Sequence, residues 1–230
     1  MNRIRRQTAE HLAAAWRAAP HVFQAVEIDF SRLDKVRRAA KPAFAERHGV
    51  SLTYLPFIAR AACLALGDFP RCNAHFSENR LIVRGQIHLA IAVDLDHEGL
   101  VAPVIHDAGN KSLADLAVAL AALADKARAG KLTLADIEGG TYTISNNGSF
   151  GTLFTTPIIN VPQVAILSLD AIAMRPTVVA TEQGDVLMAR PVAMVGQSFD
   201  HRAMDGAYSA AFLARLKEIV ETRDWSAELG

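Results

Sequence analysis

The chain has 230 residues, of which 51% are hydrophobic, and its 24 basic and 24 acidic residues cancel to a net charge of zero. Such a chain can bury a sizeable core, and its charge balance gives no electrostatic reason to bind nucleic acid or an acidic membrane surface. No apolar run in the sequence is long enough to span a membrane, and the N-terminus lacks the apolar core of a signal peptide. We therefore expect one domain over residues 1–230, without a nucleic-acid or membrane partner.

Two cysteines, Cys63 and Cys72, stand nine positions apart. This spacing matches neither a metal site nor a redox pair, so we expect no metal cofactor. Without a disulfide pattern, a reducing compartment is the simplest inference, and the predicted location is the cytoplasm.

Apolar periodicity predicts alternating helices and strands in the first half of the chain. The predicted helices are residues 8–18, 33–47 and 54–66, and the predicted strands are residues 21–30, 80–83, 87–95 and 100–105. Pro103 places the last strand at a sheet edge, because proline cannot donate to a ladder. Ser112 and Asp115 have the spacing of a capping box that opens a long helix. The apolar face of that helix comprises Leu113, Leu116, Leu120 and Leu123.

Strands are predicted to dominate from Thr141 onward, until a C-terminal helix over residues 207–220. A strand over residues 192–199 precedes this helix. The predicted core face of the helix comprises Tyr208, Ala211, Phe212, Leu216, Ile219 and Val220. This order of elements predicts an α/β domain in which helices cover a mixed sheet.

Residues 197–206 carry a histidine, His201, with Asp205 four positions later and Gly206 directly after it. The segment lies between the predicted strand and the C-terminal helix, where Gly206 is expected to supply the backbone freedom that the turn requires. Taken alone, the motif fits a structural histidine in a tight turn as well as a reactive one. Its interpretation therefore depends on other segments.

Residues 139–151 form a second informative segment, a β-type run that ends in hydroxyl, amide and glycine residues. The polar end includes Ser145, Asn146 and Ser149. Such a strand end can aim a hydroxyl donor at a reacting group. The same residues are also ordinary turn chemistry, so a hairpin turn is the alternative.

Four segments, residues 2–12, 140–146, 156–167 and 200–206, resemble in order and spacing the catalytic domain of the 2-oxo-acid dehydrogenase dihydrolipoamide acyltransferases. The resemblance runs from about Asn2 to about Thr222. It implies a two-layer α/β sandwich of the chloramphenicol acetyltransferase type, the CoA-dependent acyltransferase fold. Chloramphenicol acetyltransferases share the His-x-x-x-Asp-Gly turn, but they usually carry a second histidine where this chain has Asp200, and they lack the Thr-Ile-Ser-Asn segment.

The resemblance implies acyl transfer between dihydrolipoamide, carried on a lipoyl domain, and coenzyme A, with neither a metal nor a covalent enzyme intermediate. A thiol that attacks a thioester is mostly protonated at neutral pH, so it needs a general base, and His201 is expected to take this role. The family match assigns Ser145, rather than Ser149, as the hydroxyl that stabilises the oxyanion.

Supporting roles also follow from the resemblance. Asp205 is implied to hold the turn through an ion pair with an arginine, for which Arg5 is the candidate. Asn146 is expected to help shape the pocket, without a chemical role. His97 and His106 flank a loop and are expected to have no role.

Family members form homotrimers with the active site between subunits, and we expect the same here. Their trimers join into cubic or icosahedral cores through a C-terminal segment. The tail of this chain has only two large apolar residues, Trp225 and Leu229. Because so few apolar residues contribute little to contacts between trimers, we expect a stable trimer, and assembly into a closed shell stays an alternative. The other expected partners are the lipoyl domain and the E1 and E3 components of a 2-oxo-acid dehydrogenase complex, of which this chain is the E2 core.

We expect neither a lipoyl domain nor a peripheral subunit-binding domain in the chain, which is either a piece of a longer protein or a bare core. Asp125, Lys126 and Ala127 form the tripeptide of lipoyl-lysine sites, but they fall inside a predicted helix, so we expect no lipoylation of Lys126. Two other functions stay open, a structural scaffold in such a complex and a stand-alone CoA-dependent acetyltransferase with a small acceptor. The acyl group is acetyl, succinyl or branched-chain.

Overall fold

The computed structural model describes residues 3–95, 97 and 99–229, and Asn2, at which the resemblance begins, lies outside the described residues. The helices are α1 (Arg3–Ala18), α2 (Ser31–His48), α3 (Leu55–Asp68), α4 (Leu113–Arg128) and α5 (Gly206–Thr222). Short 3-10 turns lie at Pro70–Cys72, Ala108–Asn110, Leu134–Asp136 and Gly148–Phe150. The strands are β1 (His21–Asp29), β2 (Ala74–Ser77), β3 (Arg80–Val83), β4 (Leu89–Ile91), β5 (Val93–Asp94), β6 (Leu100–Val101), β7 (Val104–Ile105), β8 (Tyr142–Asn146), β9 (Ala165–Leu169), β10 (Ala173–Thr181) and β11 (Gly184–Asp200).

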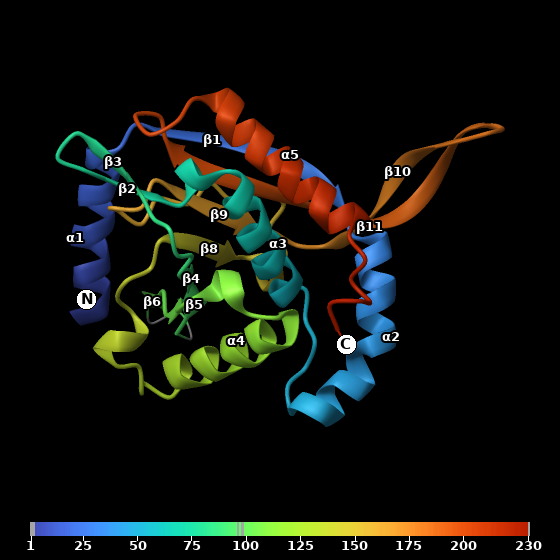
Figure 1. The fold of residues 1–230 in the computed structure, drawn as a ribbon, viewed down its shortest axis with the longest axis horizontal. Coiled ribbons are helices and arrows are strands. Elements are labelled where there is room, and N and C mark those ends of the chain that lie inside the picture. Colours follow the sequence, from blue (N-terminus) through green and yellow to red (C-terminus); the bar gives the residue numbers. More distant parts are fainter. Residues whose placement is uncertain (1–2, 96, 98, 230) are drawn as a thin grey trace.

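A mixed seven-stranded sheet forms the centre of the described chain, in the order β1-β11-β9-β8-β4-β7, with β10 paired to β11. β8 runs parallel to both of its neighbours, β4 and β9, and the other pairs in this sheet are antiparallel. α3 and α5 lie side by side over one face of the sheet, and α4 packs next to α3 (Figure 1). The predicted α/β architecture, a mixed sheet covered by helices, is confirmed.

The main core lies between the sheet and these helices. Among its fully buried side chains are Phe57, Tyr142, Phe199, Phe212 and Leu216. A second, smaller buried cluster of Ala19, Ile159 and Ile166 covers part of the opposite face. On that face Phe154 stacks on Phe23 of β1 (6.5 Å between ring centroids) and remains 58% exposed. The opposite face therefore keeps apolar surface in contact with solvent.

Local sequence signals predicted several boundaries correctly. Ser112 caps α4, because its hydroxyl accepts a bond from the Asp115 N–H (3.1 Å) and the Asp115 carboxylate accepts one from the Ser112 N–H (3.3 Å). β7, which follows Pro103, is an edge strand of the sheet. Lys126 lies inside α4 and pairs with Asp136 (3.0 Å), so the helical placement predicted for this lysine is confirmed.

The strands between residues 87 and 105 are shorter than predicted. The strand expected at residues 87–95 divides into β4 and β5, because the chain leaves the main sheet after Ile91 and β5 pairs with β6. The strand expected at residues 100–105 divides in the same way, into β6 and β7. β2, the hairpin partner of β3, is missing from the prediction.

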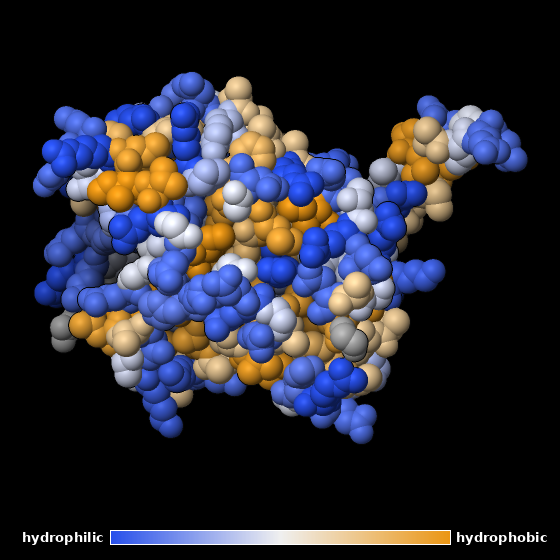
Figure 2. Space-filling view, in the orientation of Figure 1, coloured by the Kyte–Doolittle hydropathy of each residue, from blue (hydrophilic) through white to orange (hydrophobic). Residues whose placement is uncertain are grey.

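The strand predicted at residues 192–199 is the end of a longer strand, β11. The first half of β11 forms with β10 a hairpin that projects from the body of the molecule (Figure 1). Figure 2 shows apolar side chains along this hairpin up to its polar tip, and Val178 and Leu187 are 63% and 75% exposed. In α5 the prediction was wrong for Ala211, which is exposed, whereas Ser209 and Leu213 are buried.

The C-terminal tail folds back onto its own chain. Trp225 is 1% exposed and meets the ring of Phe57 in α3 edge-on (5.3 Å between ring centroids). Its indole N–H donates to the Val220 carbonyl (3.0 Å). The largest apolar side chain of the tail is therefore part of the chain's own core.

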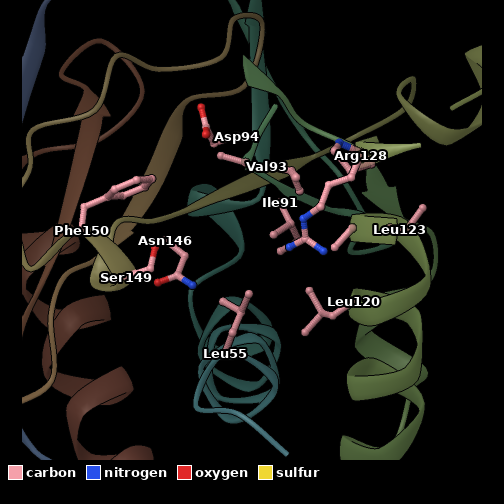
Figure 3. A pocket seen from close by; sticks show the side chains of 13 residues that line it. Leu55, Ile91, Val93, Asp94, Leu120, Leu123, Arg128, Asn146, Ser149 and Phe150 are labelled. Atoms are coloured by element: carbon pink, nitrogen blue, oxygen red, sulfur yellow. The ribbon is translucent and has the colours of Figure 1, made fainter. Parts of the chain in front are cut away.

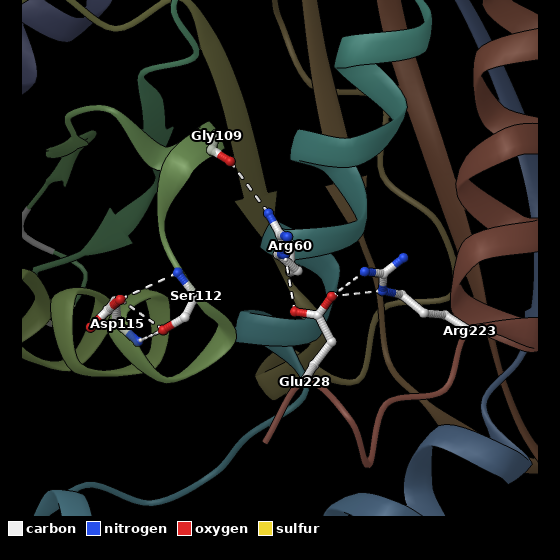
Figure 4. A network of polar contacts seen from close by, with 6 residues as sticks. All are labelled: Arg60, Gly109, Ser112, Asp115, Arg223 and Glu228. Carbon is white, nitrogen blue, oxygen red and sulfur yellow. Dashed lines mark hydrogen bonds and ion pairs between the residues drawn. The ribbon is translucent and has the colours of Figure 1, made fainter. Parts of the chain in front are cut away.

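A polar network fixes the end of the tail (Figure 4). Glu228 accepts bonds from Arg60 (3.2 Å) and Arg223 (2.8 Å). Arg60 also donates to the Gly109 carbonyl (3.3 Å) and so links the tail to the loop before α4. Burial raises the pKa of Glu228, but the bonds from the two arginines outweigh burial and hold this pKa below its ordinary value. Glu228 therefore stays ionised at neutral pH.

We expect Trp225→Ala to lower the free energy of unfolding by about 3 to 5 kcal/mol, the usual cost of removing a large buried aromatic side chain. Urea denaturation followed by circular dichroism measures the change. Leu134→Ala is the control, because Leu134 is 64% exposed and its replacement should change the free energy by less than about 0.5 kcal/mol. A loss below about 1 kcal/mol for Trp225→Ala would show that the tail leaves the core in solution.

Both cysteines are buried and unpaired, and burial raises the pKa of each thiol to about 12. Among the described residues, no group of three or more His, Cys, Asp or Glu side chains could hold a metal ion. None of the helices in the described part of the chain is long and apolar enough to cross a membrane.

Candidate active site

His201 occupies the turn between β11 and α5, at the end of the sheet. Gln197 fixes the strand before this turn, because its buried side chain accepts a bond from Tyr142 (2.7 Å) and donates to Ser209 of α5 (2.9 Å). The His201 backbone N–H donates to the Pro20 carbonyl, between α1 and β1 (3.1 Å). The His201 side chain is exposed. An imidazole on a fixed backbone and open to solvent can accept a proton from a bound thiol.

Asp200, directly before His201, holds the turn. Its buried carboxylate accepts bonds from the backbone N–H (2.9 Å), Nε (3.0 Å) and Nη2 (2.7 Å) of Arg202. The bonds to Asp200 raise the pKa of Arg202, whose guanidinium also lies 4.2 Å from the centroid of the Phe76 ring. Sequence reasoning missed this pair, although an aspartate and an arginine on either side of the histidine are a visible signal.

Asp205 follows the turn at the start of α5. Its side chain is exposed at the N-cap of α5 and makes no capping bond. Among the described residues no ion pair joins Asp205 to Arg5, which donates to the His97 carbonyl (3.4 Å). Arg5 is too far away for such a pair. It lies about 20 Å along the axis of α1 from the end of the helix, where Pro20 contacts the turn. The described residues therefore do not form the predicted Arg5–Asp205 pair, an ion pair in this turn joins Asp200 to Arg202 instead, and the roles of Arg5 and Asp205 stay predictions.

Gly206 has an ordinary backbone conformation and lies close to β1. The described glycines with a positive φ are Gly49, Gly130, Gly139, Gly151 and Gly184, so the special conformation expected at Gly206 is absent. A Cβ on Gly206 would lie 3.2 Å from the side-chain nitrogen of Gln24 on β1. The turn therefore approaches β1 closely at Gly206, and a side chain there would require Gln24 to shift.

Ser145 lies near the end of β8, on the face of the sheet opposite α5. The alternation of a strand sends Tyr142 into the core and Ser145 to the other face. The Ser145 hydroxyl accepts a bond from the Asn147 side chain (3.3 Å) and donates to no described residue, so it keeps a proton with which to meet an oxyanion. β8 pairs in parallel with β9, so no hairpin turn follows it and the hairpin alternative is wrong.

The Ser145 hydroxyl faces a cavity of about 520 Å³ between the sheet, α1 and residues 155–160. The wall of this cavity is mainly apolar and includes Leu12, Val101, Pro157, Ile158 and Ile166. Nε2 of His11 in α1 bonds to the Asn160 side chain (2.9 Å) and ties the two sides of the cavity together. An apolar cavity with a few polar groups is typical of a small-molecule site.

Asn146 points to the other side of β8 from Ser145, into a second cavity of about 300 Å³ (Figure 3). Arg128 extends into this cavity from α4, across from Ser149 and Phe150. Ser145 and Ser149 therefore belong to different cavities, although they are close in sequence. Asn146 lines this second cavity and not the one that Ser145 faces, so the expected part of Asn146 in shaping the pocket of Ser145 stays a prediction.

One chain does not bring His201 and Ser145 together. In the sheet register Ser145 pairs with Ser168 of β9, which pairs with Gly196 of β11. His201 comes five residues after Gly196, about 16 Å further along the strand, and β11 lies two strands, or about 10 Å, from β8. An active site that uses both residues must therefore combine two chains.

Comparison with known proteins identifies the family of this chain. A family model described as the catalytic domain of the 2-oxoacid dehydrogenases acyltransferases matches residues 1–226. The chain belongs to this family. One relative is the dihydrolipoyllysine-residue acetyltransferase component of the pyruvate dehydrogenase complex of Mycobacterium tuberculosis. The sequence identity is 42%, and the match covers 100% of this chain and 42% of the length of that protein. This chain is also 38% identical to the succinyltransferase component of the 2-oxoglutarate dehydrogenase complex of Bartonella vinsonii, over 96% of the chain and 53% of that protein. The chain thus spans about half or less of these relatives.

Solved structures of the acyltransferase family share the fold throughout. The dihydrolipoamide acetyltransferase of Azotobacter vinelandii matches with a TM-score of 0.91 and 34% identity, over 100% of this chain and 92% of that one. The roles of a serine, a histidine and an asparagine in its catalytic mechanism were investigated, and its asparagine follows the histidine by four positions, as Asp205 follows His201 here. A chloramphenicol acetyltransferase, 13% identical over 92% of this chain and 94% of its own, matches with a TM-score of 0.59 and shares the fold.

We expect Asp200→Asn to lower kcat by about 10- to 100-fold, because Arg202 loses its charged partner and the turn no longer holds His201 in place. Steady-state assays and a crystal structure of the variant measure the two effects. Asp205→Asn is the matched control for the position of His201, since it introduces the amide found at this spacing in the A. vinelandii enzyme. If His201 is displaced in Asp205→Asn and stays in place in Asp200→Asn, then Asp205 holds the turn, as the family resemblance implies.

Proposed function

We propose that this chain transfers an acyl group between dihydrolipoamide, carried on a lipoyl domain, and coenzyme A, as the E2 core of a 2-oxo-acid dehydrogenase complex. Membership of the acyltransferase family supports the proposal. The observation that carries it is the Ser145 hydroxyl, which faces an apolar cavity and donates to no described residue. His201 supplies the base, from an exposed turn that a second chain can reach.

The proposed reaction needs one base and one oxyanion donor. Neutral His201 takes the proton of the attacking thiol as its sulfur bonds to the carbonyl carbon of the thioester. Negative charge grows on the carbonyl oxygen, where the Ser145 hydroxyl donates a bond that is stronger in the transition state than in the ground state. When the tetrahedral intermediate collapses, the second sulfur leaves and receives the proton from His201. Coenzyme A is a substrate here, and the lipoyl group belongs to another domain.

The proposed unit is a homotrimer in which each site combines Ser145 of one chain with His201 of another. The separation of these two residues within one chain supports this arrangement. Apolar side chains that remain in solvent, such as Phe154 and Leu187, also support it, because they offer surface for contacts between chains. Trp225 is engaged in its own core, so we propose the trimer as the stable state, with a cubic or icosahedral shell as the larger alternative.

Light scattering at micromolar concentration tests the assembly. We expect a mass near three chains of 24.8 kDa each. A monomer with full activity would contradict the shared site, and a particle of many trimers would show that the short tail contributes more than its contacts suggest.

The proposal also covers the partners, the location and the domain extent of the chain. Its partners are the lipoyl domain and the E1 and E3 components, its location is the cytoplasm, and residues 1–230 form one catalytic domain. Membership of the family supports the partners, and the sequence patterns support the single domain and the location.

Turnover by the purified chain tests the proposed reaction. Free dihydrolipoamide is offered with acetyl-CoA, succinyl-CoA and a branched acyl-CoA in turn, and we expect transfer with at least one of them. A folded trimer that transfers none would favour the structural scaffold. A trimer that prefers a small hydroxylated acceptor to dihydrolipoamide would favour a stand-alone acetyltransferase.

A further inference from the structure

His21, the first residue of β1, makes two hydrogen bonds that define its protonation. Its Nε2 lies 3.0 Å from the backbone nitrogen of Ile159, and its Nδ1 lies 2.8 Å from the Ala19 carbonyl oxygen. A carbonyl oxygen only accepts, so Nδ1 carries the proton, and a backbone N–H only donates, so Nε2 is bare. His21 is therefore a neutral imidazole with its proton on Nδ1.

Ile159, which donates to His21, belongs to the segment that forms one wall of the Ser145 cavity. Its side chain is fully buried, and its neighbours Ile158 and Asn160 line the cavity. A backbone N–H at such a buried position needs an acceptor, and His21 supplies it. The bond between His21 and Ile159 thus sets where this wall stands relative to Ser145.

The residues between α1 and β1 also support the turn that carries His201. Pro20, directly before His21, accepts the backbone N–H of His201 (3.1 Å). His21 itself stands opposite Asp200 in the register of β1 and β11. Trp16 stacks on the His21 ring (4.9 Å between ring centroids). His21 therefore stands between the wall of the Ser145 cavity and the His201 turn.

We propose that His21 is a positioning residue for acyl transfer, which holds the wall of the Ser145 cavity through its bare Nε2. The proposal rests on the acyl transfer proposed above. Without this acceptor the Ile159 N–H loses its partner, residues 157–160 shift, and the thioester is held less firmly against Ser145. A misplacement of about 1 Å is enough to lower kcat/KM by about 10- to 100-fold.

Two substitutions separate the hydrogen bond from the bulk of the ring. His21→Gln places an amide oxygen where Nε2 stands, so it restores the acceptor and should keep kcat/KM within about three-fold of wild type. His21→Phe keeps a ring that stacks on Trp16 but has no acceptor, and kcat/KM should fall by about 10- to 100-fold. Part of this fall should be a higher KM for acyl-CoA, whereas a mere loss of folded protein lowers kcat alone.

NMR of the isotope-labelled wild-type protein provides a check that needs no variant, and it should show a protonated Nδ1 and a bare Nε2 for His21. Three results would overturn the proposal: wild-type constants for His21→Phe, equal damage in His21→Gln and His21→Phe, or a proton on Nε2 in the wild type. A wild-type chain that transfers no acyl group would instead overturn the proposed function, and the NMR result would still decide whether His21 holds the wall as described.

Discussion

Replacing His201 with alanine is expected to lower kcat by about 10² to 10⁴ while the fold stays intact. The His201 imidazole is exposed, and the contacts that hold the turn come mainly from the His201 backbone and from Asp200. The substitution therefore removes the proton acceptor and leaves its support in place. Steady-state turnover with dihydrolipoamide and acyl-CoA measures the loss, and thermal unfolding checks the fold.

His106→Ala is the matched control for this experiment. His106 is also an exposed histidine, but it follows β7 at the far edge of the sheet and is expected to have no role. Its replacement should change kcat by less than about two-fold. Near-normal turnover in His201→Ala would remove His201 from its role as the base.

Replacing Ser145 with alanine is expected to lower kcat by about 10² to 10³ with a modest change in KM, the pattern of a lost oxyanion donor. Ser145 stands at a fixed strand position, and its hydroxyl is oriented by the Asn147 side chain (3.3 Å). Alanine leaves the shape of the cavity almost unchanged but cannot donate, so the substrate still binds while the transition state loses a bond. Initial rates at varied acyl-CoA concentration separate kcat from KM.

Ser149→Ala controls for a general effect of removing a hydroxyl from this segment. Ser149 lines the smaller cavity on the other side of β8, so its replacement should leave kcat near the wild-type value. If Ser149→Ala is the damaging change and Ser145→Ala is not, the choice of Ser145 from the motif is wrong.

Features that depend on a short stretch of chain could be predicted from the sequence. The capping box of Ser112 and Asp115 marks the start of α4, and Pro103 marks an edge strand. The β2–β3 hairpin escaped prediction because its two turn residues, Glu78 and Asn79, adopt positive φ values of 49° and 58° without the glycine that usually signals such a turn. The order of motifs, rather than any single motif, was enough to predict the family.

Features that depend on the folded chain could not be predicted. His21 and Ile159 are 138 positions apart, and nothing local to either residue indicates that they meet. Nothing in the sequence indicates that Gln24 lies close to Gly206. The distance between His201 and Ser145 follows from the register of three strands, so the sequence could indicate both residues but not their separation within one chain.

Mixed trimers test the central claim, that each active site combines His201 of one chain with Ser145 of another. Chains with His201→Ala and chains with Ser145→Ala are coexpressed with different tags, and trimers that contain both are purified. In any such trimer one of the three interfaces joins an intact His201 to an intact Ser145, so we predict about a third of the wild-type activity from two inactive parents. Mixed trimers as inactive as either parent would contradict the shared site.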